Sequence, residues 1–184
     1  MRNDDTLLIR RLTNRYNSIV NFFWTILLLT PVVIFCYNEM PVKLLVIFLT
    51  ASFLTVLLPK SFFDGMIVRN KKFYKNIGLD FINRFTQNGV IVNRLIQKKV
   101  PEYKVVSGST RSIDKLIAQS YMFEKFHFIA FVFFLLTTIY AMINGHFIWS
   151  VFFIVGNILY NVYPILLQHY IRGRLKIRRV KNKI

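Results

Sequence analysis

The chain of 184 residues combines 54% hydrophobic residues, including 19 phenylalanines, with a formal net charge of +17. A soluble domain with this charge is rarely so aromatic, and a nucleic-acid-binding protein does not gather its apolar residues in long uncharged blocks. The composition therefore excludes an ordinary soluble domain and nucleic acid as a partner, and it indicates an integral membrane protein of the all-α class.

The N-terminal segment, residues 1–17, mixes leucines with arginines, which is typical of a short helix at the membrane interface. The apolar block that follows is too long for a cleaved signal peptide, and no small-residue cleavage site comes after it. The single cysteine, Cys36, excludes an intrachain disulfide and a cysteine metal cluster. We therefore expect an uncleaved interfacial helix that leads directly into the membrane.

Four apolar blocks of 18 to 22 residues follow one another along the chain. They cover residues 18–37, 42–59, 126–143 and 146–167, and only Lys43, near the end of one block, carries a full charge. At about 1.5 Å per residue, each block is long enough to cross a hydrocarbon core of about 30 Å. We therefore predict a single membrane domain with four transmembrane helices in two hairpins.

The basic residues predict how the chain is oriented. Of the 25 lysines and arginines, 24 lie in residues 1–17, 60–125 and 168–184, and only Lys43 lies at a connection within a hairpin. By the positive-inside rule, both termini and the central segment face the cytoplasm of a multi-pass protein of the cell membrane. The central segment contains too many large apolar residues for a disordered linker, so we expect amphipathic helices on anionic lipid headgroups. Two explanations fit this basic surface, a general electrostatic attraction to anionic lipids and a specific site for a phosphate group.

A carboxylate and an imidazole occur where the third apolar block begins. Taking 100° per residue, Glu124 and His127 lie on one stripe of a helix. The stripe also contains Ile113, Ile117, Ser120 and Phe131. Because desolvating a carboxylate or an imidazolium is costly, a chain usually pairs such groups or uses them.

The fourth apolar block carries a second polar stripe. Its members, at spacings of four, seven and four residues, are Asn157, Asn161, Gln168 and Arg172. On an uninterrupted helix they fall within about 60° of one another, although Pro164 can kink it. The two asparagines are also suited to hydrogen bonds between helices. Taken with the pair in the third block, the stripe favours a cavity open to the cytoplasmic leaflet.

Two motifs resemble the glycosyl-4,4'-diaponeurosporenoate acyltransferase family, small bacterial membrane proteins that esterify a glycosylated carotenoid acid with a fatty acyl chain. The first is Glu124-x-x-His127, and a fainter likeness is the FYKNIG run at residues 73–78. The second motif reads Asn161…Pro164…Gln168-His169-Tyr170-Ile171-Arg172-Gly173-Arg174-Leu175. The resemblance covers about residues 62–175 and implies an acyltransferase of carotenoid biosynthesis.

The chain departs from the family pattern at four positions. His169, Ile171 and Gly173 stand where the family has Arg, Asn and Pro, and Met122 replaces a basic residue. These departures are compatible with an acyltransferase, but they leave the identity of the acceptor undetermined. A glycosylated carotenoid, another hydroxylated lipid and a polyprenoid glycolipid all remain candidates.

The residues fit acyl transfer to a hydroxyl. His127 is the predicted base, Glu124 would fix its tautomer and stabilise the imidazolium, and His169 is the alternative base. The arginines would bind a phosphate of the acyl donor, and an amide would donate to the oxyanion. The predicted substrate-binding residues are Asn161, Gln168, Tyr170, Arg172 and Arg174. Without a serine elbow or a reactive cysteine, direct transfer from acyl-CoA or an acyl carrier is favoured, with no further cofactor.

Two other classes of function stay open. In a non-enzymatic membrane subunit, the basic cytoplasmic layer would dock a protein partner or anionic lipid, and Glu124 and His127 would only pair with a basic residue. Alternatively, Glu124, His127 and His169 would bind a divalent metal. Only the first two of these have local ligand spacing, so we predict no metal site.

Overall fold

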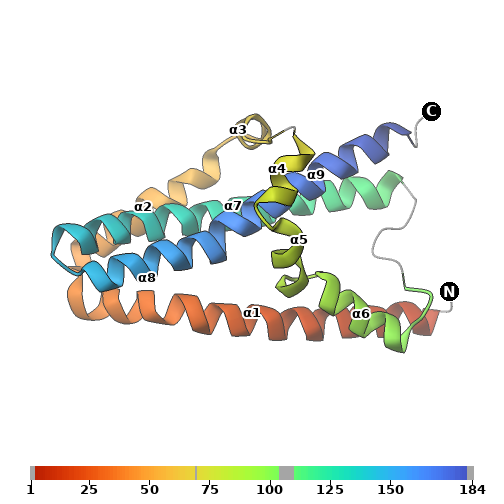
Figure 1. Cartoon of the computed structure of the whole chain (residues 1–184), viewed down its shortest axis with the longest axis horizontal. Helices are drawn as coiled ribbons and strands as arrows, with labels where there is room; N and C mark the ends of the chain where they lie inside the picture. The colour runs from red at the N-terminus through yellow and green to blue at the C-terminus, as the bar shows by residue number, and fades with distance from the viewer. Residues whose placement is uncertain (1–2, 69, 104–109, 182–184) are drawn as a thin grey trace.

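The computed structural model describes residues 3–68, 70–103 and 110–181, and these residues form helices and connections without any strand. The helices in chain order are α1 (Asn3–Glu39), α2 (Val42–Leu54), η1 (Thr55–Leu57), α3 (Lys60–Gly65), α4 (Lys71–Asn76), α5 (Leu79–Ile82), η2 (Asn83–Phe85), α6 (Val90–Lys99), α7 (Thr110–Ile143), α8 (Phe147–Asn157), η3 (Ile158–Val162) and α9 (Tyr163–Lys181). Figure 1 shows the long helices along one axis, with the short ones α4, α5 and α6 crossing one side of the bundle. The predicted helical class is confirmed for the described residues.

Three helical segments are long and apolar enough to cross a membrane, Leu7–Glu39, Ser112–Ile143 and Phe147–Val180. The predicted second span, 42–59, is shorter, because its helix covers only Val42–Leu57. Proline explains where it ends: the residue before a proline is forced out of the helical region, and Leu58 before Pro59 has ψ 131°. By length and composition, the described residues therefore contain three candidate spans and not clearly four.

Two of the long helices extend beyond the apolar blocks that predict them. α1 runs without a break from Asn3 through Pro31 to Glu39, so residues 3–17 of the expected interfacial helix form its first turns. α7 begins at Thr110, well before the predicted span 126–143. In α7 the amphipathic run and the apolar block share one helical period, and no proline or glycine separates them.

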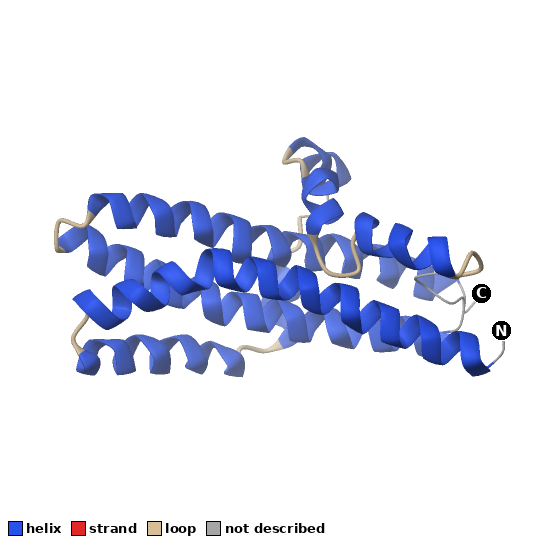
Figure 2. Ribbon diagram, turned by 90° about the horizontal axis from the view of Figure 1, so that it is seen from below, coloured by secondary structure: helices blue, strands red, loops and turns tan. Residues whose placement is uncertain are grey.

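An aromatic core holds the bundle together at the end opposite to the first turns of α1 and the last turns of α9. Figure 2 shows the helix ribbons lying side by side at this end, away from both termini. The ring of Phe35 lies 5.1 Å from that of Phe153. The Tyr140 hydroxyl donates to the Glu39 carbonyl over 2.7 Å, and the Glu39 carboxylate lies 3.6 Å from His146. These contacts fix the α1–α2 and α7–α8 turns beside each other.

The short helices bridge α9 and α1 at the other end. Tyr74 and Leu79 pack against Leu167 of α9, and the Tyr163 hydroxyl donates to the Ile77 carbonyl over 3.0 Å. Further along the chain, α6 packs on α1 through a cluster of Leu12, Val92 and Ile96. The central segment thus borders the space between α1 and α9, where a large cavity lies.

Candidate functional site

Glu124 lies fully buried between α7 and α9. One of its carboxylate oxygens contacts Nε2 of His169, and the other accepts a hydrogen bond from Nη1 of Arg172. All three side chains are at most 1% exposed. The structure therefore brings three of the predicted site residues together in one buried ionic cluster.

Arg172 extends this cluster to α3. Its Nη2 donates to the Phe63 carbonyl over 3.3 Å, and its guanidinium carbon lies 4.1 Å from the centre of the Tyr121 ring. Its Nε lies 3.2 Å from Oδ1 of Asp64, an ion pair without hydrogen-bond geometry. Two carboxylates thus compensate one buried guanidinium, as the cost of desolvating a charge requires.

Asp64 forms an outer layer with two residues of α7 and α9. The Tyr121 hydroxyl lies 2.7 Å from both Asp64 oxygens, and Lys176 Nζ donates to Oδ2 over 2.9 Å. Burial raises the pKa of the Asp64 carboxyl, but the hydrogen bonds from Lys176 and Tyr121 and the charges of Lys176 and Arg172 outweigh this, so its pKa lies below the usual value. Asp64 is therefore ionised at neutral pH.

Sequence reasoning missed Asp64, Tyr121 and Lys176. Asp64 is the only acidic residue between Glu39 and Asp80, in a stretch that otherwise carries only basic charges. That isolated carboxylate was a usable signal, since it needs a cationic partner. Tyr121 and Lys176 gave no comparable signal, because their role depends on where α3 lies.

The structure differs from the expected pairing of Glu124 with His127. Residues three apart on a helix point about 60° away from each other, so they can face different neighbours. Glu124 turns to α9, whereas the His127 ring packs edge-on against Tyr160 at 5.8 Å. The Asn161 amide also approaches this ring, yet within the described ranges neither His127 Nδ1 nor Asn161 Oδ1 has a well-formed hydrogen bond.

A cavity of about 1950 Å³ lies on the His127 side of α7. Its walls come from α1, the 81–88 turn, α7 and the η3–α9 helix. The predicted residues that line it are His127, Gln168, Tyr170 and Arg174. Glu124, Asn161, His169 and Arg172 are outside the lining and buried. The predicted residues therefore divide into a cavity-lining group and a buried group that packs α9 onto α7.

Asn161 belongs to a helix-to-helix hydrogen-bond chain. Its Nδ2 donates to Asn157 Oδ1 over 2.8 Å, and Asn157 Nδ2 donates to the Phe131 carbonyl of α7 over 3.2 Å. The helix here widens into the π-helical turn η3. Pro164 explains the widening, because it has no N–H for the carbonyl four residues earlier and its ring crowds that carbonyl. For Asn157, the structure thus shows the alternative that the sequence also allowed, a hydrogen bond between helices.

The residues considered for a divalent metal do not come together. Glu124 and His169 are in contact, but His127 faces the cavity instead. In the part of the chain that the structure describes, no group of three or more histidine, cysteine or acidic side chains could hold a metal ion.

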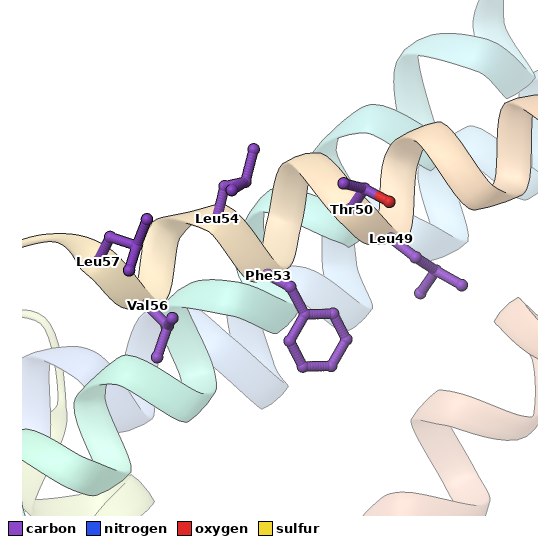
Figure 3. A pocket seen from close by; sticks show the side chains of 6 residues that line it. All are labelled: Leu49, Thr50, Phe53, Leu54, Val56 and Leu57. Carbon is purple, nitrogen blue, oxygen red and sulfur yellow. The ribbon is translucent and has the colours of Figure 1, made fainter.

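A second, smaller hollow of about 350 Å³ lies on α2 and η1. Figure 3 shows its lining, Leu49, Thr50, Phe53, Leu54, Val56 and Leu57. None of these side chains titrates, and the only polar one is a threonine. The hollow therefore offers an apolar surface and no reactive group.

The model of the glycosyl-4,4'-diaponeurosporenoate acyltransferase (CrtO) family matches residues 59–181. The match includes Glu124-x-x-His127 and the run from Asn161 to Leu175, and it leaves α1, α2 and η1 outside. No curated protein and no solved structure matches the chain.

Proposed function

The chain belongs to the glycosyl-4,4'-diaponeurosporenoate acyltransferase family, and on that premise we propose that it transfers a fatty acyl group to a hydroxyl of a lipid or glycolipid. A glycosylated carotenoid is one candidate acceptor. The observation that carries the proposal is the cavity of about 1950 Å³ that His127 lines. It exceeds the roughly 300–1,000 Å³ of a site for one drug-sized molecule, so it has room for an acyl chain and an acceptor together.

His127 acts as the base in this proposal. Its ring takes the proton of the acceptor hydroxyl while the oxygen attacks the thioester carbonyl of acyl-CoA or an acyl carrier. The carbon–sulfur bond then breaks, and the imidazolium returns the proton to the departing thiolate. The position of the ring in the cavity lining supports this role, because it brings an imidazole to the space that the two substrates would share.

Three cavity-lining residues of α9 serve as substrate contacts. The Gln168 amide can donate to the oxyanion that develops on the thioester carbonyl. Arg174 lies with its Nη1 3.4 Å from the Tyr170 hydroxyl, and this pair suits a phosphate of the acyl donor. Arg172 and Asn161, by contrast, are buried outside the cavity lining and serve as positioning residues.

Glu124 also acts by positioning. Through Arg172 and His169 it fixes the part of α9 that carries Gln168, Tyr170 and Arg174. His169 is the second candidate base, because a carboxylate holds one of its nitrogens while its Nδ1 lacks a partner in the described part of the chain. We favour His127 because His169 lies outside the cavity lining.

The reaction takes place at the cytoplasmic leaflet in this proposal. The cavity lies at the bundle end formed by the basic segments, where Arg174 and Arg178 contribute to its wall. Since lysines and arginines concentrate on the cytoplasmic side of membrane proteins, this end faces the cytoplasm. Anionic headgroups would hold the basic layer there.

Replacing His127 tests the proposal. His127→Ala should lower the turnover of purified protein by about 10²-fold, the usual contribution of a general base, while its abundance stays nearly unchanged. His146→Ala is the matched control, because that histidine lies 3.6 Å from Glu39 at the opposite end of the bundle. The acylated product itself should disappear from the lipids of cells that lack the gene.

Two outcomes would contradict the proposal that the protein is an acyltransferase with His127 as its base. Full activity of His127→Ala would transfer the role of base to His169. An unchanged lipid profile without the gene, together with no acyl transfer by the purified protein, would instead favour a non-enzymatic subunit that docks lipid or protein.

A further inference from the structure

One face of α1 carries neutral polar side chains into a largely apolar stretch. At spacings of three and four residues they are Asn14, Asn17, Ser18, Asn21, Trp24 and Thr25, and all of them line the large cavity. The outer faces of the same turns expose Ile19, Phe22 and Ile26. Since amides within a membrane helix are costly without a use, this stripe needs an explanation.

Part of the stripe fixes the 85–88 turn on α1. Asn17 makes two hydrogen bonds with Asn88, of 2.9 Å and 2.8 Å, one to its side chain and one from its backbone N–H. Gln87 donates to Asn21, and Trp24 Nε1 donates to the Phe85 carbonyl over 3.0 Å. These contacts hold the turn and α1 together as one wall of the cavity.

The amides of this wall are only half used. Asn21 accepts through its carbonyl, and its NH₂ group makes no hydrogen bond within the described ranges. Gln87 donates through its NH₂ group, and its carbonyl is likewise unused by the described residues. A carboxamide offers two donors and two acceptor lone pairs, so the wall presents both kinds of group at fixed positions. Hydroxyl groups, which donate and accept at once, match such a surface.

The two sides of the cavity, one formed by α1 and the 81–88 turn and the other by α9, also differ in charge. The lining residues within 13–25 and 81–88 include no charged side chain, although the chain carries +17. The cations of the lining, Arg174 and Arg178, come from α9. A phosphate-bearing donor therefore fits the α9 side, and a neutral headgroup fits the α1 side, where the rings of Trp24 and Phe85 add flat apolar faces.

We propose that α1 and the 85–88 turn bind a neutral, polyhydroxylated headgroup of the acceptor lipid, with Asn21 and Gln87 as specificity-determining residues. This inference rests on the proposed acyl transfer and locates acceptor selection partly outside residues 59–181, the region that the family model matches.

The experiment compares two acceptors that differ only in the headgroup. The full chain, in phosphatidylcholine vesicles with radiolabelled palmitoyl-CoA, receives either dodecyl glucoside or dodecanol. Asn21→Leu and Gln87→Leu should each raise the KM for the glucoside about tenfold, the equivalent of one lost hydrogen bond. Transfer to dodecanol should stay unchanged, and Asn21→Gln, which keeps an amide, should recover part of the effect. Asn38→Leu makes the same change at the far end of α1 and should alter neither acceptor.

Equal losses with both acceptors, or no loss with either, would overturn the subsite. Fluorescence of Trp24 gives a second readout that needs no turnover, with Trp24→Phe as its blank. Glucoside binding that Asn21→Leu weakens, without any acyl transfer by the wild type, would support the subsite and refute the acyltransferase proposal. Acyl transfer to the glucoside that stays unchanged in the Asn21 and Gln87 variants would support the acyltransferase proposal and refute the subsite.

Discussion

Arg172 is fully buried although it carries a full charge, because Glu124 and Asp64 both lie against its guanidinium. Removing one partner of such a pair leaves an uncompensated charge, which costs on the order of 3–5 kcal/mol. We therefore expect Glu124→Ala to lower the stability of the purified protein strongly in a thermal unfolding assay. Asp114→Ala is the control, since its pair with Arg179 at 2.8 Å is 44% exposed on both sides and such pairs contribute about 0–1 kcal/mol.

The double variant Glu124→Leu/Arg172→Met separates packing from chemistry. Because replacing a whole buried ion pair by apolar side chains is often neutral, it should recover most of the stability that Glu124→Ala loses. If Glu124 only positions α9, this stable variant keeps much of its activity. A stable but inactive double variant would mean that Glu124 acts on the reaction through His169.

At the level of single residues, the sequence motifs identified Glu124, His169 and Arg172 as candidate site residues but did not predict that they contact one another. Glu124 and His127 lie on one stripe, yet the position of α9 decides that the carboxylate meets His169 and Arg172 instead. Asp64 joins them from α3, a segment far away in the sequence. Such contacts depend on how separate helices pack, and helical periodicity carries no information about that.

At the scale of the elements, a substitution at Gly89 in the η2–α6 turn measures how tightly this wall of the cavity packs. A Cβ at Gly89 would lie 2.1 Å from the Asn83 carbonyl oxygen and 2.7 Å from that of Thr86. Gly89→Ala must therefore displace the backbone, which we expect to cost about 1–3 kcal/mol as overpacking does and to break the Asn17–Asn88 contact. Thermal unfolding and transfer to dodecyl glucoside should both be impaired.

Gly173 in α9 provides the matched control for this element. Nothing lies within 4 Å of a Cβ built there, so Gly173→Ala meets no clash. Alanine is also the better helix former by about 1 kcal/mol, and the variant should be at least as stable as the wild type. Equal stability of both variants would mean that the η2–α6 turn is not closed around Gly89 as tightly as these distances indicate.

Helix type could be predicted from the apolar blocks, whereas helix ends depended on single prolines and on packing. Pro59 ends the second block early, while Pro31 lies inside α1 without breaking it. The difference is that uncharged residues surround Pro31 on both sides, whereas the charged residues Lys60 and Asp64 follow Pro59 closely. The half-filled amide stripe of α1 also escaped prediction, because its partner turn lies some 70 residues away.

At the scale of the whole molecule, the shorter helix Val42–Leu57 decides the topology. It begins beside the C-terminal end of α7, where Tyr140 donates to the Glu39 carbonyl, and it ends where Lys125 Nζ donates to the Val56 carbonyl over 2.6 Å. It therefore runs along the whole uncharged part of α7 between these two residues. That stretch measures about 22 Å at 1.5 Å per residue, less than a full hydrocarbon core, but snorkelling lysines and local thinning accommodate such a mismatch.

If this helix crosses, both ends of the chain and the central segment lie on the cytoplasmic side. In a Cys36→Ala background, a membrane-impermeant maleimide added to intact cells should then label Asn38→Cys and Asn144→Cys but not Gln97→Cys or Val180→Cys. A three-span protein gives a different pattern, with Gln97→Cys and Val180→Cys labelled and Asn144→Cys protected, because the second helix would leave the central segment outside. Labelling after permeabilisation confirms that the protected cysteines are reactive. The three-span pattern would also move the His127 cavity to the outer leaflet, beyond the reach of acyl-CoA.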